Sequence, residues 1–250
     1  MSTGLNKFRR QILHTVASAQ EGHAPSALSI LDLVYCWFSR EHETRRDNDI
    51  FLLSKGHASL ALYVVLASCD LLDIKEVEAY CQKGSKLGGH PDSRKVPLLQ
   101  ISSGSLGHGL PLAVGRAMAS QLRELKRTVF VLVGDGELNE GTNWEALLVA
   151  SSRKISGICV MVDANGSTDR AIELSDLKMK FQSFGFEVRE IDGHNHLAIF
   201  ESYRWATERD RSVIIARTVK GFGIPQMENN PEWHHKFPKI SEIDEMLDQS

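Results

Sequence analysis

The stretch VFVLVGDGELNEG, residues 129–141, decides the fold. Its first five residues are all apolar, which predicts a short strand buried on both faces. A glycine-rich turn carrying Asp135 follows, and a helical pattern resumes over 143–152. A strand, turn and helix in this order are typical of a parallel sheet covered by helices, and they put Asp135 at the carboxyl end of its strand.

The same alternation extends along most of the chain. We predict strands at 49–54, 128–133, 157–162, 186–191 and 212–218, and helices at 5–19, 26–38, 58–67, 106–125, 143–152, 175–184, 196–208 and 240–247. Residues 83–105, rich in Gly, Pro, Ser and Lys, are interpreted as a long irregular segment with a functional role. The pattern predicts an α/β fold with a doubly wound, mainly parallel sheet flanked by helices, in one domain spanning 1–250.

Composition excludes several classes of protein. The 250 residues are 42% hydrophobic and 24% charged, in the range of ordinary globular proteins. The net charge of −3 comes from mixed acidic and basic residues without a basic stripe, so we expect no nucleic-acid or membrane partner. Four cysteines without a C-x-x-C spacing predict reduced thiols, and neither a signal peptide nor a membrane span is evident. We therefore expect a cytoplasmic protein.

Two successive predicted strands end in oxygen-bearing side chains. Asp135 follows the strand at 128–133, Asn165 follows the strand at 157–162, and the main-chain carbonyl of Ser167 comes two residues later. Because parallel strands end at the same edge of a sheet, these oxygens form a candidate site for Mg²⁺ or Ca²⁺, which prefer oxygen ligands. Each segment alone is equally compatible with an ordinary turn. The two in this order favour a cation that holds a diphosphate.

Several further segments, between about residues 5 and 238, resemble the amino-terminal, thiamine diphosphate-binding region of transketolases. They are Ser54-Lys55-Gly56-His57-Ala58, Gly88-Gly89-His90-Pro91, Ser103-Gly104-Ser105-Leu106-Gly107, the Gly134–Gly141 turn, Thr218-Val219-Lys220-Gly221 and Met227-Glu228-Asn229-Asn230-Pro231-Glu232-Trp233-His234. The resemblance covers almost the whole chain and all six segments occur in the family's order. It implies the thiamine diphosphate-binding fold.

The resemblance also implies a role for each matching residue. The implied metal ligands are Asp135, Asn165 and Ser167. The implied cofactor-binding residues are Ser26, His57, Gly104, Ser105, Leu106, Gly136, Glu137, Asn165, Lys220 and His234. The implied catalytic residues are His23, His90, His234 and Glu140. Lysine and histidine can neutralise phosphate charge, and histidines can hydrogen-bond sugar hydroxyls and move protons near neutral pH. Glu140, implied to lie near a subunit interface, is equally compatible with an acid that stabilises a helix start.

Taken as a transketolase-type transferase, the chain would transfer a two-carbon ketol unit from a ketose, sugar phosphate or related 2-oxo donor to an aldehyde acceptor. In this family the glutamate that activates the cofactor lies in the second domain, which this chain does not reach. We therefore expect activity only with a carboxy-terminal partner subunit that supplies that glutamate, in a heterotetramer. A fragment of a longer protein is the competing interpretation.

Four departures from the family's pattern concern the substrate. Ala24 stands where proline is usual, His108 interrupts a usual Gly-Gln-Gly, and His235 replaces a common glycine. The connection from Asn165 to Leu174 is several residues shorter than usual. Asp135 and Asn165 are retained, so the departures predict an unchanged metal site and a specialised donor or acceptor.

Two other functions stay open at this point. One is a subunit of a different thiamine diphosphate-dependent enzyme, such as a 2-oxo acid dehydrogenase alpha chain or a deoxyxylulose phosphate synthase relative. The other is a non-catalytic homologue that regulates a true transketolase. Metal-dependent cofactor binding by the assembled pair would distinguish an enzyme from the regulatory homologue.

Overall fold

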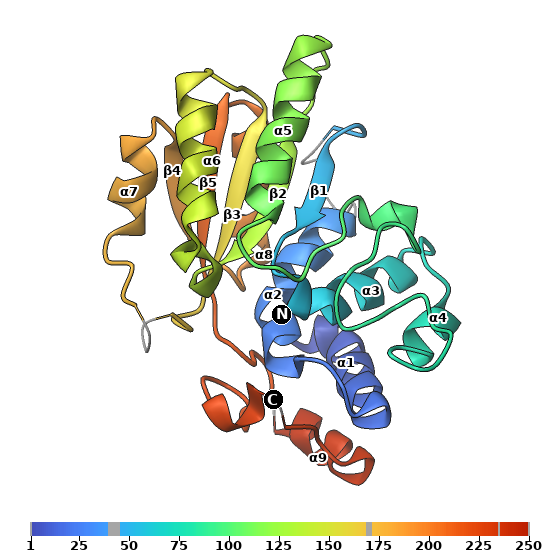
Figure 1. The fold of residues 1–250 in the computed structure, drawn as a ribbon. Coiled ribbons are helices and arrows are strands. Elements are labelled where there is room, and N and C mark those ends of the chain that lie inside the picture. Colours follow the sequence, from blue (N-terminus) through green and yellow to red (C-terminus); the bar gives the residue numbers. More distant parts are fainter. Residues whose placement is uncertain (1, 40–45, 169–171, 235, 250) are drawn as a thin grey trace. The chain divides into compact units, whose positions relative to one another are not determined.

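The computed structural model describes residues 2–39, 46–168, 172–234 and 236–249 (Figure 1). The chain divides into two compact units. The helical unit comprises 1–39, 56–102 and 218–250, and the sheet unit comprises 40–55 and 103–217. The single domain predicted for 1–250 stays a prediction.

The sheet unit is built on five parallel strands. They are β1 (Ile50–Leu53), β2 (Val129–Gly134), β3 (Ile158–Ala164), β4 (Glu187–Asp192) and β5 (Arg211–Arg217), in the spatial order β1-β2-β3-β5-β4. Every residue of β2 and β3 is buried, as expected of inner strands covered on both faces. The β2–β3 register pairs Gly134 with Asp163, so both strands end at the same edge.

Four α-helices belong to the sheet unit: α5 (Gly109–Leu122), α6 (Gly141–Ser152), α7 (Leu177–Ser183) and α8 (His196–Thr207). Helices α5 and α6 pack side by side on the face of the sheet turned toward the viewer in Figure 1. The β4–α8–β5 crossover runs back across the sheet, and its usual right-handed turn puts α8 on the other face. The doubly wound α/β fold predicted from the sequence is confirmed.

The helical unit contains α1 (Asn6–Ala19), α2 (Ala24–Phe38), α3 (Ser59–Ser68), α4 (Ile74–Glu78) and α9 (Ile243–Asp248). Pro25 lies in the first turn of α2, where its missing N–H costs no hydrogen bond. Helix α2 is apolar around most of its circumference and packs against both α1 and α3. It therefore forms the core of this unit. No helix among the described residues is long and apolar enough to cross a bilayer.

The sequence missed helix α4. Its five residues bury only Val77, too short a run to show helical periodicity. A start signal was nevertheless present, because the Asp73 carboxylate caps the helix by accepting a hydrogen bond from the main-chain N–H of Lys75. The segment 83–105 is irregular as predicted, apart from a short 3-10 helix at Pro97–Leu99.

The four cysteines give a direct test of the packing. All are free, with Cys36 and Cys159 buried and Cys69 and Cys81 half-buried. Complete burial raises the pKa of the Cys159 thiol to about 12. We expect native-state iodoacetamide labelling at pH 8, followed by peptide mass spectrometry, to modify Cys69 well before Cys159. Rapid labelling of Cys159 in folded protein would contradict the packing of β3.

Candidate cofactor site

Two strand tips in the sheet unit bring their oxygen atoms together. Asp135 follows β2 and is buried, whereas Asn165 follows β3 and is half-buried. The main-chain N–H of Ser167 donates to Asp135 Oδ2 over 3.1 Å and to Asn165 Oδ1 over 3.0 Å. Both oxygens are therefore close enough to share one donor. Carboxylate and amide oxygens are the kind of ligands that hard cations such as Mg²⁺ prefer.

The electrostatics of this edge also favour a cation. Burial raises the pKa of Asp135, and the neighbouring Asp163 carboxylate raises it further. A hydrogen bond from the Gly136 N–H and the charge of Lys55 lower this pKa by smaller amounts. An ionised carboxylate is thus costly here unless positive charge is nearby. Among the described residues no cluster of three or more His, Cys, Asp or Glu side chains could hold a metal. The candidate ligands would therefore be one carboxylate, one amide and a main-chain carbonyl.

A buried ion pair lies directly behind the two candidate ligands. Lys55, which follows β1, pairs its ammonium group with Asp163 at the end of β3, and the exposed fractions of the two side chains are 3% and 0%. Its methylene groups lie close to Gly134 on the intervening strand. Asp163 Oδ2 also accepts from Asn165 Nδ2 over 3.0 Å. The pair thus holds the amide with its oxygen turned toward Ser167.

The Glu137 carboxylate accepts hydrogen bonds from three loops of the sheet unit. Its Oε1 accepts hydrogen bonds from the Ser54 hydroxyl and, over 3.0 Å, from the Gly107 N–H, while Oε2 accepts from the Gly134 N–H over 3.2 Å. Burial raises the pKa of Glu137, although all three donors oppose that shift. The carboxylate therefore fixes the segment 103–107 against the ends of β1 and β2.

Gly107 is a position where only glycine fits. Its φ of +83° lies in the left-handed region, and a Cβ atom there would come within 2.5 Å of Thr142 Oγ1 and 2.6 Å of Glu140 Cβ. Thr142 Oγ1 donates to the Gly107 carbonyl over 2.8 Å. This close approach places the Gly104–Leu106 strip beside the start of α6. Glu140 is exposed there as the first flanking residue of that helix.

The helical unit gathers a second group of candidate residues. The His23 ring lies 5.6 Å from the His57 ring and 5.2 Å from the His234 ring, measured between centroids. His23 Nδ1 is 3.2 Å from the His234 carbonyl oxygen, and Lys220 Nζ is 3.3 Å from His234 Nδ1. Ser26 is buried one turn into α2, where its N–H donates to the His23 carbonyl over 3.1 Å. Residues from four distant parts of the sequence thus form a basic, hydrogen-bonding cluster.

His90 is placed differently from those three histidines. It is exposed and borders a cavity of about 500 Å³ in the helical unit, together with Glu21, Cys81 and Lys95. Charged, hydrogen-bonding side chains therefore line this cavity.

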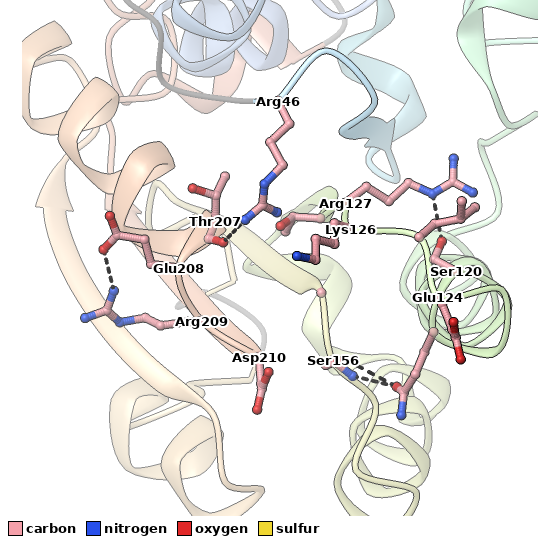
Figure 2. A pocket seen from close by; sticks show the side chains of 14 residues that line it. Arg46, Ser120, Glu124, Lys126, Arg127, Ser156, Thr207, Glu208, Arg209 and Asp210 are labelled. Atoms are coloured by element: carbon pink, nitrogen blue, oxygen red, sulfur yellow. Dashed lines mark hydrogen bonds and ion pairs between the residues drawn. The ribbon is translucent and has the colours of Figure 1, made fainter.

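The sheet unit has another cavity at the opposite ends of its strands (Figure 2). It measures about 430 Å³ and is bordered by Thr128, Gly157 and Asp210, each directly preceding a strand. Three of its four basic side chains have acceptors: Arg46 donates to the Thr207 carbonyl, Arg127 to Ser120, and Arg209 pairs with Glu187 and Glu208. We interpret it as a surface network.

The sequence did not reveal the roles of Lys55, Asp163 and Ser54. Lys55 and Ser54 lay within a recognised segment, and Asp163 interrupts an otherwise apolar strand, which is a signal of a buried paired charge. Which of these side chains pair with one another depends on the order of the strands in the sheet. The pairing is therefore visible only in the folded structure.

Comparisons with known proteins identify the family. Residues 2–249 match the family described as transketolase, thiamine diphosphate binding domain. The chain belongs to this family. The transketolase resemblance and the transketolase-type transferase assignment predicted from the sequence are thereby confirmed, as is a cofactor site for thiamine diphosphate.

Two relatives of the transketolase family resemble the chain over most of their length. One of them, from Actinobacillus succinogenes, is a subunit of apulose-4-phosphate transketolase. It is 34% identical, and the alignment covers 96% of this chain and 92% of that protein. The 6-deoxy-6-sulfo-D-fructose transketolase subunit SqwG of a Clostridium species is 31% identical, with 91% of this chain and 87% of that protein covered.

Solved transketolases share the fold. That of Campylobacter jejuni superposes with a TM-score of 0.80 at 28% identity, covering 92% of this chain and 39% of that one. The chain therefore spans about two fifths of the length of this solved transketolase.

Some predicted features lie outside the described residues. These are His235 and the residues Asp169 and Arg170 of the shortened connection. The roles assigned to individual site residues stay predictions.

The close approach at Gly107 can be tested by stability. In Gly107→Ala the new methyl group must displace Thr142 or Glu140 and adopt a strained φ, which we expect to cost about 1–3 kcal/mol of unfolding free energy. Urea denaturation of the isolated chain measures this. Gly115→Ala is the matched control, because a Cβ there meets nothing within 4 Å and Ala favours helix. Equal stability of the two variants would contradict the geometry.

The Lys55–Asp163 pair generates a separate prediction. Lys55→Met leaves a buried carboxylate without its partner, and we expect a loss of about 3–5 kcal/mol of unfolding free energy. Additional replacement of Asp163 by Leu should restore part of that loss, because no buried charge then remains. Denaturant titration of the two single variants and the double variant measures the coupling. Additive losses would show that the two groups do not interact.

Proposed function

We propose that this chain is the amino-terminal subunit of a two-component transketolase, which binds thiamine diphosphate through a divalent cation and transfers a two-carbon ketol unit. The observation that carries the proposal is the convergence of Asp135 and Asn165 oxygens on one point in a domain of this family. The residues fit the group, since hard oxygen atoms stand beside an excess of buried negative charge.

In this proposal Asp135, Asn165 and the Ser167 carbonyl hold Mg²⁺ or Ca²⁺. Gly136 lies in the turn after β2, where the absence of a side chain allows a phosphate to approach its backbone. Lys55 contributes indirectly by keeping Asp163 paired, so that Asn165 presents its oxygen. Glu137, with both oxygens bonded to loop donors, holds the Gly104–Leu106 strip in place for the cofactor.

The basic cluster of the helical unit contains the other residues to which the resemblance assigns a role. Lys220, His57 and His234 bind the diphosphate and balance its charge. When bound, thiamine diphosphate supplies the carbon nucleophile that cleaves and forms the carbon–carbon bond. His23, His90 and His234 bind sugar hydroxyls, and the imidazoles move protons at those oxygens.

The proposed donor is a ketose or sugar phosphate, and the proposed acceptor is an aldehyde. The names of the two relatives support an anionic sugar, since one specifies a sugar phosphate and the other a sulfonated fructose. The carboxy-terminal partner subunit supplies the activating glutamate, next to Glu140 and the Gly104–Leu106 strip. We propose a cytoplasmic heterotetramer.

Cofactor binding tests the metal site directly. In Asp135→Ala we expect the affinity for thiamine diphosphate in the presence of Mg²⁺ to fall at least about 100-fold, because a charged cation ligand is lost. Isothermal titration of the assembled pair measures it. Glu201→Gln, an exposed acid on α8, is the control that keeps wild-type affinity. Unchanged affinity in Asp135→Ala would overturn the assigned metal site.

Ketol transfer tests the reaction itself. We expect the chain with a carboxy-terminal transketolase subunit to transfer two carbons between a ketose phosphate and an aldehyde, and neither chain alone to do so. Product formation followed by mass spectrometry measures it. Cofactor binding without transfer from any ketose would favour a subunit of a different thiamine diphosphate-dependent enzyme, and activity of the single chain would contradict a split site.

A further inference from the structure

The segment of the helical unit that carries Lys220 has no regular structure to hold its shape. Residues 218–230 form turns between the end of β5 and the short 3-10 helix at Pro231–His234. A loop of this kind is precise only where side chains and turn contacts support it. Because the proposed function assigns Lys220 to the diphosphate, the contacts that fix this segment bear on cofactor binding.

Arg9 of α1 is a buried cation to which neither the resemblance nor the proposed reaction gives a role. Its side chain is 1% exposed, and its Nη1 donates to Asn6 Oδ1 over 3.0 Å. Burial lowers the pKa of Arg9, whereas the carboxylates of Asp32 and Glu228 raise it. An arginine stays charged in proteins, and apolar side chains often fill such a position with equal or greater stability. The buried guanidinium therefore indicates a role other than stability.

The Arg9 side chain supports the bend of this segment at residues 222–223. Its Nε donates to the Phe222 carbonyl over 3.4 Å, and its Cζ lies 5.5 Å from the centroid of the Phe222 ring. Gly223 has a φ of +81°, and a Cβ atom there would come within 2.7 Å of Arg9 Cζ. The Gly223 N–H donates to Glu228 Oε1 over 2.9 Å. The guanidinium thus fills the space that a side chain at position 223 would need.

Main-chain hydrogen bonds link this bend to Lys220. The Gly221 N–H donates to the Pro25 carbonyl over 3.0 Å, and the Asn229 N–H donates to the Lys220 carbonyl over 2.8 Å. Residues 220–229 therefore form a closed loop that starts and ends beside Lys220. Because Phe222 is only two residues from Lys220, a shift of the bend at Arg9 must move the backbone from which the ammonium extends.

We propose that Arg9 is a positioning residue, whose guanidinium holds the 220–229 loop in the shape that presents Lys220 to the diphosphate. This inference rests on the proposed function. Without the guanidinium the loop keeps its main-chain hydrogen bonds but loses the support behind its bend. Arg9 therefore sets the affinity for the diphosphate and does not touch the reacting atoms.

A conservative change at Arg9 tests the proposal. Arg9→Lys keeps a positive charge at this buried position but lacks the planar guanidinium that contacts the Phe222 ring and carbonyl. We expect the dissociation constant of the assembled pair for thiamine diphosphate in the presence of Mg²⁺ to rise about 10-fold. Isothermal titration measures it. Arg10→Lys is the matched control, because Arg10 is half exposed on the same helix and pairs with Asp244. Wild-type affinity in Arg9→Lys would overturn the proposal.

A second change at Lys220 separates positioning from a general structural effect. In Lys220→Met the ammonium that Arg9 positions is gone. Adding Arg9→Lys to this variant should therefore change the dissociation constant for the cofactor by less than about twofold. If the two losses of affinity instead add in full, Arg9 does not act through Lys220 and the proposal fails.

The same contact can be disturbed from the loop. In Gly223→Ala the new methyl group must displace the Arg9 guanidinium, and we expect weaker cofactor binding, as in Arg9→Lys. Gly84→Ala is the control for backbone strain. Gly84 has a similar φ of +87°, but a Cβ atom there meets nothing within 4 Å, so this variant should keep wild-type affinity. Equal affinities of the two variants would contradict the contact.

Hydrogen exchange tests the loop without any cofactor. In the isolated chain we expect the N–H groups of Gly221, Gly223 and Asn229 to exchange faster in Arg9→Lys than in wild type, because the unsupported loop opens more often. Unchanged exchange would overturn the loop as the means by which Arg9 acts. If the wild-type pair does not bind thiamine diphosphate, the proposed function fails, and the exchange rates decide separately whether Arg9 holds the loop.

Discussion

Three acidic side chains are buried at the carboxyl ends of adjacent parallel strands, and the organisation of the sheet unit depends on how their charge is balanced. Asp163 has the Lys55 ammonium, Glu137 has one hydroxyl and two main-chain N–H donors, and Asp135 has two main-chain N–H donors. Buried carboxylates are tolerated only with such partners. Asp135 combines main-chain donors with a neighbouring carboxylate that raises its pKa, which makes it suited to an external cation.

The same groups also set the positions of the loops. The hydrogen bonds of Glu137 draw the strip before α5 against the ends of two strands, and the left-handed Gly107 lets that strip pass close to the start of α6. Loop geometry around the site is therefore coupled to the positions of α5 and α6.

The helical unit combines an apolar helical core with a cluster of histidines. Its core is the apolar helix α2, whose first turn carries Ser26, and the histidines that face one another come from segments up to 211 residues apart. His23, His57 and His234 each contact another member of the cluster, with Lys220 beside the last. Such a group concentrates hydrogen-bonding and proton-transfer capacity in a small volume beside the Lys220 ammonium, and it would match an anionic, hydroxyl-rich ligand.

The sequence by itself determined the fold class, nearly every helix and strand, and the identity of the oxygen-bearing residues at the ends of β2 and β3. These follow from local signals: apolar runs, helical periodicity and glycine turns act over a few residues. Tertiary structure alone decided that Lys55 crosses β2 to reach Asp163, that Glu137 turns inward, and that α5 keeps an apolar side away from its own sheet. Those outcomes depend on the order of the strands and on which face of a helix is covered. Neither property can be predicted from a short stretch of sequence.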